Sequence, residues 1–322
     1  MSEVAKDERV KKTTLLNKML RRPEFGALLG AIAIFTLFTS FDTTGNFGQA
    51  GGIAGWTDIA APIGIIAVFV ALLMIGGEFD LSTGVMVGTS GLLTGMLVTQ
   101  FGLDIWSSII IVLLFSLAVG FVNGWLVVKT GLPSFIVTLA TFFVLRGANL
   151  AVTKEITGTV RVSETDKAVN FEQAEAFLAA KIEFLGANFQ ITIVWWIALT
   201  LLATWVLTRT KFGNWIFASG GDANAARNAG VPVARTKIIL FMMTSGAAAL
   251  VGIMLVLRLK GMQAGQGVGM EFFYIIAAVV GGTLLTGGKG SAIGASIGAA
   301  VMGMAYIGIP FALGIRTGYS LS

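Results

Sequence analysis

Two carboxylates stand among glycines where two hydrophobic runs meet, in the string GGEFDLSTG at residues 76–84. A charged side chain at the centre of a bilayer costs several kcal/mol, so Glu78 and Asp80 should line a cavity, pair with a base or lie at a membrane surface. Because glycines allow a helix to break, Asp80 or Ser82 can cap a helix that restarts at Gly84. These polar side chains are candidates for a solute path, and a plain interfacial turn is an equally good interpretation.

Two more polar residues lie within hydrophobic runs and are also candidates for that path. Asn123 is followed by Gly124 inside a long apolar stretch, and this pair is more typical of a contact between packed helices than of a ligand site. Thr138 lies in the string PSFIVTLAT at residues 133–141. The candidate solute path therefore comprises Glu78, Asp80, Ser82, Asn123 and Thr138.

A second glycine-rich string, GGKGS at residues 287–291, invites comparison with a phosphate-binding loop. A loop of that kind ending at Lys289 requires glycine where Thr283 stands, a hydroxyl residue where Gly290 stands, and a preceding strand. The sequence therefore predicts no nucleotide site here, and any ATP chemistry must belong to another subunit. We expect the glycines of this region to serve helix packing or gating instead, namely Gly281, Gly282, Gly287, Gly288 and Gly290.

The residue types that the chain lacks exclude most enzymes. It has no Cys and no His among its 322 residues, which excludes a thiol nucleophile, an imidazole base and metal sites built on either side chain. We therefore expect no catalytic residues, metal or cofactor in this chain. The formal net charge of +5 comes mainly from basic residues beside hydrophobic runs, which indicates membrane topology rather than binding of nucleic acid.

Hydrophobic residues make up 55% of the chain and charged residues 12%, so we predict an all-α integral membrane protein rather than a soluble domain, in which about 25% charge is usual. A basic tail at residues 1–22 precedes the membrane domain at 23–310. An acidic insertion at 152–190 suits the exterior, with a surface helix over 172–182. Residues 311–322 are too short and polar to cross a bilayer. About nine spans are expected, at residues 25–41, 59–75, 85–101, 105–128, 133–145, 191–208, 238–257, 272–285 and 292–309.

The longest polar interruption in the second half of the chain is the loop at residues 209–237. Loops rich in Lys and Arg stay on the cytoplasmic side, so this loop and the basic N-terminal tail are expected inside. Within the loop, two glycines release the backbone, Asp222 can cap a short helix over residues 223–229, and Gly230 can end it. The alanines of this helix would let another protein approach closely, but a short helical turn that only joins two spans is an equally good interpretation.

The chain carries, in this order, GGEFDLSTG, Asn123-Gly124, PSFIVTLAT followed by Arg146-Gly147, RTKFGNWIFASGGDANAARNAGV and VVGGTLLTGGKGSAIGASIGA. With these strings it resembles the permease subunits of bacterial ATP-binding-cassette (ABC) importers for monosaccharides, of the ribose, xylose and galactose type; branched-chain amino-acid permeases are more distant relatives. The resemblance runs from about Ile59 to Ile309.

The chain departs from the family pattern in two places. Glu78-Phe79 stands where the family has a single apolar residue, which affects the geometry of that turn. The family usually has one more span, ten in all, and we interpret the atypical residues 311–322 as a truncation.

The resemblance implies a pore built from two identical or related permease chains in the lipid of the bacterial inner membrane, with the N-terminus inside. It implies that the helix after Asp222 docks on a cytoplasmic ABC ATPase, which binds ATP and Mg²⁺. The exterior loops would receive a periplasmic binding protein loaded with a monosaccharide or related polyol. Closure of the ATPase pair would then switch the pore between two states of access. The residues expected to couple to the ATPase are Gly220, Gly221, Asp222, Ala225, Ala226, Arg227 and Gly230.

Two other functions are consistent with the sequence. An ion-driven secondary transporter would use Glu78 and Asp80 as coupling carboxylates, and its uptake would depend on an ion gradient rather than on ATP. A membrane anchor or assembly protein that transports nothing would tolerate Asp80→Ala and a disrupted loop at 209–237. An enzyme is the least supported interpretation, because no pair of nucleophile and base is visible.

Overall fold

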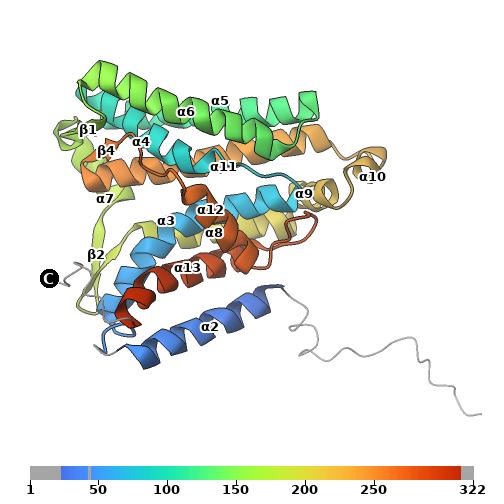
Figure 1. Cartoon of the computed structure of the whole chain (residues 1–322), viewed down its shortest axis with the longest axis horizontal. Coiled ribbons are helices and arrows are strands. Elements are labelled where there is room, and N and C mark those ends of the chain that lie inside the picture. The colour runs from blue at the N-terminus through green and yellow to red at the C-terminus, as the bar shows by residue number, and fades with distance from the viewer. Residues whose placement is uncertain (1–22, 43–44, 313–322) are drawn as a thin grey trace, which may run out of the picture.

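The computed structural model describes residues 23–42 and 45–312. The tail predicted at residues 1–22, and residues 313–322 of the predicted C-terminal segment, lie outside the described residues. Figure 1 shows long helices that run roughly side by side, with α10 (Ala223–Asn228) at one end of the molecule and the short strands at the other. We refer to these two ends as the α10 end and the strand end.

Seven of the described helices are long and apolar enough to cross a membrane, and two shorter apolar helices, α4 (Thr83–Thr99) and α12 (Met270–Val280), accompany them. Each of these helices overlaps one predicted span, so the predicted all-α membrane fold is confirmed. The seven longer helices are α2 (Pro23–Phe41), α3 (Ala50–Ile75), α5 (Ile105–Thr130), α6 (Ser134–Thr157), α8 (Thr192–Arg209), α11 (Val233–Leu259) and α13 (Ala292–Ala312).

Some helix boundaries differ from the prediction because glycines, rather than hydropathy, set them. α6 continues to Thr157, where Gly158 ends it with a φ of 74°, so this helix extends into the segment 152–190 that we expected to lie outside the membrane domain. α12 stops at Val280, before the end of its predicted span, and Gly282 there has a φ of 88°. Only glycine adopts such left-handed conformations without a steric penalty, which makes it a common helix terminator.

The core of the fold lies around α3. All residues from Ile63 to Ile75 are buried, and α3 packs against α8, α11, α12 and α13. Small residues bring the helices close together, as is usual in membrane proteins. A Cβ atom on Gly124 of α5, for example, would lie 2.7 Å from the Cα of Ile238 on α11. The interpretation of Asn123-Gly124 as a helix-packing contact is therefore confirmed for the glycine.

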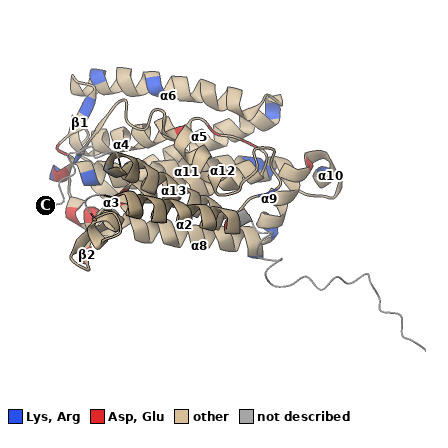
Figure 2. Cartoon of the chain, turned by 60° about the horizontal axis from the view of Figure 1, so that its bottom comes forward, with Lys and Arg blue, Asp and Glu red and all other residues tan. Residues whose placement is uncertain are grey.

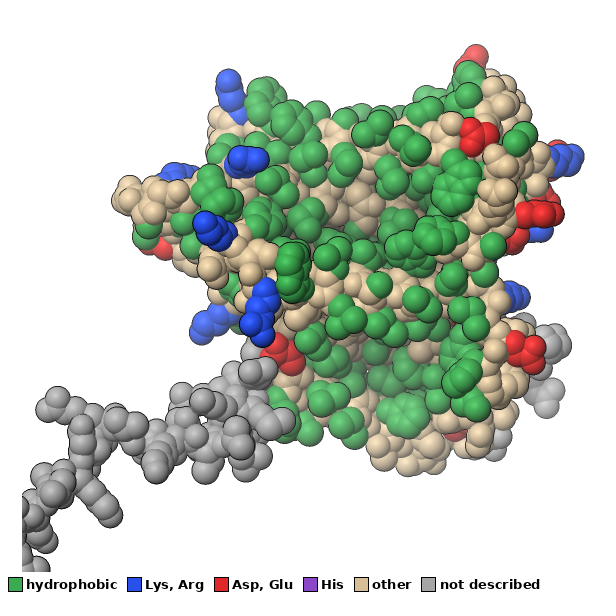
Figure 3. Space-filling view, turned by 180° about the vertical axis from the view of Figure 1, so that it is seen from behind, with side chains coloured by type: hydrophobic (Ala, Val, Ile, Leu, Met, Phe, Trp, Pro, Cys, Tyr) green, Lys and Arg blue, Asp and Glu red, His purple; other side chains and the backbone are tan. Residues whose placement is uncertain are grey.

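The outer face of the helices is apolar. α5, α6 and α8 expose large side chains such as Leu114, Val144 and Leu201. Figure 2 shows most of the charged residues at the two ends of the molecule, although Arg146 stands within α6. In Figure 3 a broad belt of apolar side chains separates an end rich in Lys and Arg, the α10 end, from an end rich in Asp and Glu, the strand end. A belt of this kind matches the hydrocarbon core of a bilayer, where charged side chains are costly.

The segment between α6 and α8 builds a small module at the strand end. Its elements are β1 (Arg161–Ser163), η1 (Thr165–Lys167), α7 (Phe171–Leu178), β2 (Lys181–Phe184) and β3 (Ala187–Gln190). β1 pairs antiparallel with β4 (Gly261–Gln263), which follows α11, and β2 forms a hairpin with β3. The turn at Leu185-Gly186 has positive φ at both residues, the conformation that two-residue hairpins favour. The surface helix predicted over 172–182 is confirmed only as far as Leu178, and Lys181 and Ile182 belong to strand β2.

Candidate functional site

α10 is a short helix that projects at the α10 end (Figure 1). Asp222 caps its start, because the Oδ1 of Asp222 accepts hydrogen bonds from the backbone N–H groups of Asn224 (2.9 Å) and Ala225 (3.0 Å). Gly230, with a φ of 81°, follows its end. Most of its residues are exposed, whereas Ala226 is buried against the rest of the protein. The predicted cap, helix and stop are confirmed, and together they present a preformed, exposed helix.

Three glycine pairs that are far apart in the sequence meet beside this helix. They follow α3 (Gly76-Gly77), end α9 (Gly220-Gly221; the helix spans Lys211–Gly221) and connect α12 to α13 (Gly287-Gly288). A Cβ atom on Gly220 would lie 1.7 Å from the backbone O of Ile75 and 2.8 Å from the N of Gly288. We call this contact the glycine junction, formed by Gly77, Gly220, Gly287 and Gly288.

The glycine junction is made of backbone atoms. The N–H of Gly288 donates a hydrogen bond to the carbonyl O of Ile75 (2.9 Å), and a Cβ atom on Gly287 would lie 3.0 Å from the Cα of Gly77. Gly77, Gly287 and Gly288 also have φ values of 86°, 81° and 72°. Since close-packed backbones cannot slide freely, a displacement of α9 and α10 must push on the end of α3 and on the α12–α13 connection.

The loop at residues 76–82 carries a chain of buried polar side chains into the membrane domain. Asp80, Ser82 and Asn123 are each fully buried. The Oδ1 of Asp80 accepts hydrogen bonds from the backbone N–H (2.8 Å) and the hydroxyl (2.6 Å) of Ser82. The Nδ2 of Asn123 donates to the Oγ of Ser82 (3.1 Å), and the hydroxyl of Thr141 donates to the Oδ1 of Asn123 (2.6 Å). This chain ties the loop to α5 and α6.

The start of α6 supports the backbone of the same loop. The Oγ1 of Thr138 accepts a hydrogen bond from the N–H of Leu81 (3.0 Å), and the Oγ of Ser134 accepts one from the N–H of Phe79 (3.0 Å). The structure therefore brings together four of the five residues assigned to the solute path from the sequence. Their polar groups bond mainly to one another and to the backbone, which is an arrangement that positions the start of α4.

Glu78, the fifth of these residues, points elsewhere. Its carboxylate forms an ion pair with the ammonium group of Lys237, near the start of α11. The side chains of Glu78 and Lys237 are only 10% and 17% exposed. Pairing with a base was one of the three situations expected for this carboxylate. The ion pair links the loop after α3 to the first turns of the helix that follows α10.

The remaining glycines of the 281–290 region also stand at close contacts or in left-handed conformations. A Cβ atom on Gly281 would lie 2.3 Å from the backbone of Gly294, so α12 and α13 touch backbone to backbone. A Cβ atom on Gly290 would lie 2.7 Å from the side chain of Ile75. Gly282 has the positive φ already described. These contacts fit the helix packing expected from the sequence, and they extend the glycine junction toward α13.

The family model described as the permease component of branched-chain amino acid transport systems matches residues 52–321. The chain belongs to this permease family. The permease is 33% identical to the ribose import permease protein RbsC of Escherichia coli (strain K12), over 92% of this chain and 87% of that protein. It is 30% identical to the xylose transport system permease protein XylH of the same strain, over 88% of this chain and 86% of that protein.

A third relative from this strain, the inner membrane ABC transporter permease protein YjfF, is 31% identical to the permease over 75% of this chain and 70% of that protein. No solved structure matches the chain significantly. With seven long apolar helices among its described residues and with these relatives, the permease is a multi-pass protein of the inner membrane.

Several residues at the site of the permease were not found from the sequence. α9 was missed, although Thr210 marks its start by accepting a hydrogen bond from the N–H of Gly213 (3.1 Å). Thr210 before a mixed polar and aromatic run is a capping signal that could have revealed this helix. Thr141 and Ser134 lie in the PSFIVTLAT string one helical turn from Thr138, on the face that bonds to the loop and to Asn123.

Among the described residues, no group of three or more His, Cys, Asp or Glu could hold a metal ion.

The role of the buried polar chain can be measured through Asn123. Asn123→Leu keeps the side-chain size but removes the donor to Ser82 and the acceptor for Thr141. We expect a loss of about 1–3 kcal/mol in the free energy of unfolding, because buried polar groups are left without partners. Thermal unfolding of the purified permease in detergent measures it. Ser116→Ala on the same helix is the control, since its hydroxyl bonds only within α5; equal losses in the two variants would contradict the prediction.

Proposed function

We propose that this permease is the membrane subunit of an ABC importer that moves a monosaccharide or related polyol into the cell. The observation that carries the proposal is the glycine junction, because it joins the segment of an exposed, capped helix to the end of α3 and to the α12–α13 connection through backbone contacts. A helix held in this way is suited to receive force from another protein. Relatives that import ribose and xylose support a sugar as the cargo.

The distribution of charge supports an orientation with the α10 end in the cytoplasm. Lys211, Arg227, Arg235 and Lys289 belong to segments at this end, and segments rich in Lys and Arg stay inside during membrane insertion. The N-terminus then lies inside and the strand end faces the periplasm.

In this orientation α10 is the coupling helix. It docks on a cytoplasmic ABC ATPase that binds ATP and Mg²⁺, while this chain carries no cofactor of its own. Asp222 and the glycines on both sides fix the helix, and Ala225 and Arg227 are exposed to the partner. ATP-driven closure of the ATPase would move α10, and the glycine junction would pass that movement to α3 and to the α12–α13 connection. Binding of nucleotide to the ATPase would then shift the equilibrium between the inward-open and outward-open states of the pore.

Two further partners complete the proposed importer. A second permease chain, identical or related, forms the other half of the pore. A periplasmic sugar-binding protein docks on the strand-end module, which is the largest structure that the described chain builds outside its apolar helices. Neither Glu78, which is paired with Lys237, nor Asp80, which accepts two hydrogen bonds from Ser82, is arranged as an exposed coupling carboxylate.

Uptake into right-side-out membrane vesicles tests the function. Vesicles with the permease and its ATPase are loaded with ATP, supplied with the binding protein, and given radiolabelled D-ribose, D-xylose or a panel of other pentoses, hexoses and polyols. We expect uptake of one of these solutes that requires internal ATP and is abolished when the ATPase is made catalytically inactive. Uptake that follows an imposed proton or sodium gradient and ignores ATP would instead establish a secondary transporter.

A further inference from the structure

A cavity of about 320 Å³ lies in the half of the membrane domain nearer the strand end. Its size is at the lower limit of the roughly 300–1,000 Å³ that is usual for small-molecule sites. It lies between α3, α4, α11, α12 and α13, and polar side chains interrupt its apolar walls. These are Asp58, Arg258, Gln266, Tyr274 and Tyr306. Aromatic rings with a polar group, beside an amide, are suited to a small solute that has both apolar faces and hydroxyls.

One segment that borders this cavity is not helical. Between β4 and α12, residues 264–269 run without regular structure, and Gly267 and Gly269 have φ values of 81° and 90°. Gly267 reaches the first turn of α4, since a Cβ atom on it would lie 2.2 Å from the carbonyl O of Gly84. α12 itself has 11 residues, so at about 1.5 Å per residue it crosses only about half of the ~30 Å hydrocarbon core. Irregular backbone at such depth is tolerated where it is buried in protein or lines a solvent-filled cavity, and broken helices of this kind build substrate sites in transporters.

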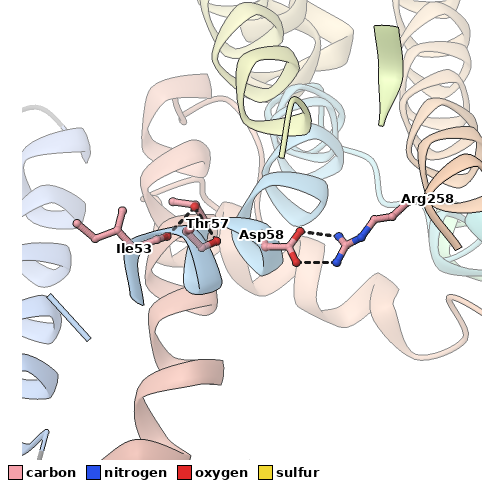
Figure 4. A network of polar contacts seen from close by, with 5 residues as sticks. Ile53, Thr57, Asp58 and Arg258 are labelled. Carbon is pink, nitrogen blue, oxygen red and sulfur yellow. Dashed lines mark hydrogen bonds and ion pairs between the residues drawn. The ribbon is translucent and has the colours of Figure 1, made fainter. Parts of the chain in front are cut away.

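An ion pair stands at the side of the cavity nearer the strand end. The guanidinium of Arg258, at the end of α11, donates from Nη1 to the Oδ1 of Asp58 (2.5 Å) and from Nη2 to the Oδ2 (2.7 Å). Figure 4 shows the two parallel bonds between α3 and α11. The hydroxyl of the neighbouring Thr57 donates to the carbonyl O of Ile53 (2.6 Å) and takes no part in the pair (Figure 4). A charged residue within a long apolar helix such as α3 is costly and therefore indicates a function.

Arg258 also borders a second hollow. This space, of about 290 Å³, is lined by Glu172 and Glu175 of α7 and also by Lys181 of β2. α7 packs against α11, and the ring of Phe177 on α7 packs edge-on against Trp195 at the start of α8 (centroids 5.1 Å apart). Arg258 therefore pairs with one carboxylate of the membrane domain and lines a hollow that it shares with two carboxylates of the strand-end module.

We propose that the Asp58–Arg258 ion pair is a gate at the exterior mouth of the sugar path, and that Arg258 opens the gate by exchanging Asp58 for the carboxylates of α7. The identity of the cargo and the orientation rest on the function proposed above. In both states the guanidinium has an acidic partner, so a displacement of α7 can shift the balance between the two states. A binding protein docked on the strand-end module could supply that displacement.

The first test measures access to the cavity. Because the chain contains no Cys, Met270→Cys at the cavity wall provides a unique thiol. In right-side-out vesicles it is treated with a membrane-impermeant methanethiosulfonate that carries a quaternary ammonium group. We expect Asp58→Asn or Arg258→Gln to speed the reaction at least tenfold, and Arg258→Lys, which keeps the charge but loses the paired bonds, to have a smaller effect. Thr159→Cys, exposed at the strand end, should react at one rate in every background. Equal rates at Met270→Cys with and without the ion pair would overturn the gate.

The second test locks the gate. In the double variant Asp58→Cys/Arg258→Cys, a bifunctional methanethiosulfonate about as long as an arginine side chain should reduce ATP-driven uptake at least tenfold, and reduction with dithiothreitol should restore it. The matched control is Glu164→Cys/Lys167→Cys, an exposed ion pair at the same end, which should transport normally when cross-linked. Unchanged uptake by the locked transporter would show that the solute does not pass this gate.

The exchange of partners has its own test. In Glu172→Gln/Glu175→Gln, addition of the binding protein should no longer speed the labelling of Met270→Cys, and uptake should fall several-fold; wild-type behaviour would overturn the exchange step. The labelling experiment with Asp58→Asn requires neither sugar nor ATP. Faster labelling without any ATP-driven uptake would therefore contradict the proposed importer but not the gate, and ATP-driven uptake with unchanged labelling would contradict the gate but not the importer.

Discussion

Replacing Gly220 with alanine should uncouple transport from ATP, whereas the same change at the adjacent Gly221 should have little effect. A Cβ atom on Gly220 would lie 1.7 Å from the backbone O of Ile75, and no side-chain rotation can relieve that contact. Nothing lies within 4 Å of a Cβ atom on Gly221. Overpacking of this kind costs about 1–3 kcal/mol, which corresponds to about a 5- to 150-fold change in the coupling between two sites.

ATP-driven sugar uptake and ATPase stimulation in vesicles measure this effect, with the amount of permease in the membrane determined in parallel. We expect Gly220→Ala to reduce uptake by about 5- to 150-fold at normal permease levels, and Gly221→Ala to remain close to wild type. If Gly220→Ala transports normally, or if the two variants fall equally, the glycine junction does not transmit the movement of α10.

Breaking the ion pair between Glu78 and Lys237 should be the most destabilising single change at the site. Both side chains are largely buried, and removing one partner of a buried pair leaves an uncompensated charge at a cost of about 3–5 kcal/mol. We expect this loss in the free energy of unfolding for Glu78→Ala and for Lys237→Ala. The double variant Glu78→Ala/Lys237→Ala should lose less than the sum of the two, since no unpaired charge is left.

Thermal unfolding of the purified variants in detergent gives the three values needed for a double-mutant cycle. The control is Glu164→Ala, which removes one partner of an ion pair whose side chains are 67% and 72% exposed, and solvent-exposed pairs of this kind contribute little to stability. Additive losses in the cycle would mean that Glu78 and Lys237 act independently and that the ion pair does not hold the loop to α11.

The ion pair also accounts for the departure of this chain from its family pattern. The sequence has Glu78-Phe79 where a single apolar residue is usual, and that departure left the geometry of the turn undetermined at the level of sequence. In the structure the ammonium group of Lys237 pairs with the additional carboxylate of Glu78, and the backbone N–H of Phe79 donates a hydrogen bond to the Oγ of Ser134. Residues 78 and 237 are separated by 159 positions, so no local pattern could have paired them. Lys237 was interpreted only as a topological signal.

Local signals predicted α10 well, and distant contacts were not predictable. Asp222 and Gly230 mark the ends of α10 through caps that involve only nearby residues. Gly220 and Gly221, by contrast, are equivalent in the sequence and differ only in what lies opposite them in space. The glycine strings were recognised one by one, but their meeting depends on the packing of α3, α9 and α12.

For the residues assigned to the solute path, the sequence also did not reveal which contacts their side chains make. Asp80, Ser82, Asn123 and Thr138 do lie together, yet they bond mainly to one another and to the backbone beside the α10 end. The cavity that could hold a solute lies in the other half of the protein, beside residues 264–269. Its residues come from five helices and an irregular segment, and single polar residues such as Asp58 and Gln266 do not form a pattern along the chain.

Because the glycine junction consists of backbone atoms, recognition of the ATPase and transmission of its movement would depend on different parts of the permease. Recognition of the ATPase would depend on exposed side chains of α10 such as Asn224, Ala225 and Arg227. Transmission of movement would depend on the contacts of the glycine junction, which involve backbone atoms only. Replacing the exposed α10 side chains with those of a related permease should therefore make this protein bind that relative's ATPase while the glycine junction stays unchanged. A few surface substitutions could then change which ATPase such a permease binds.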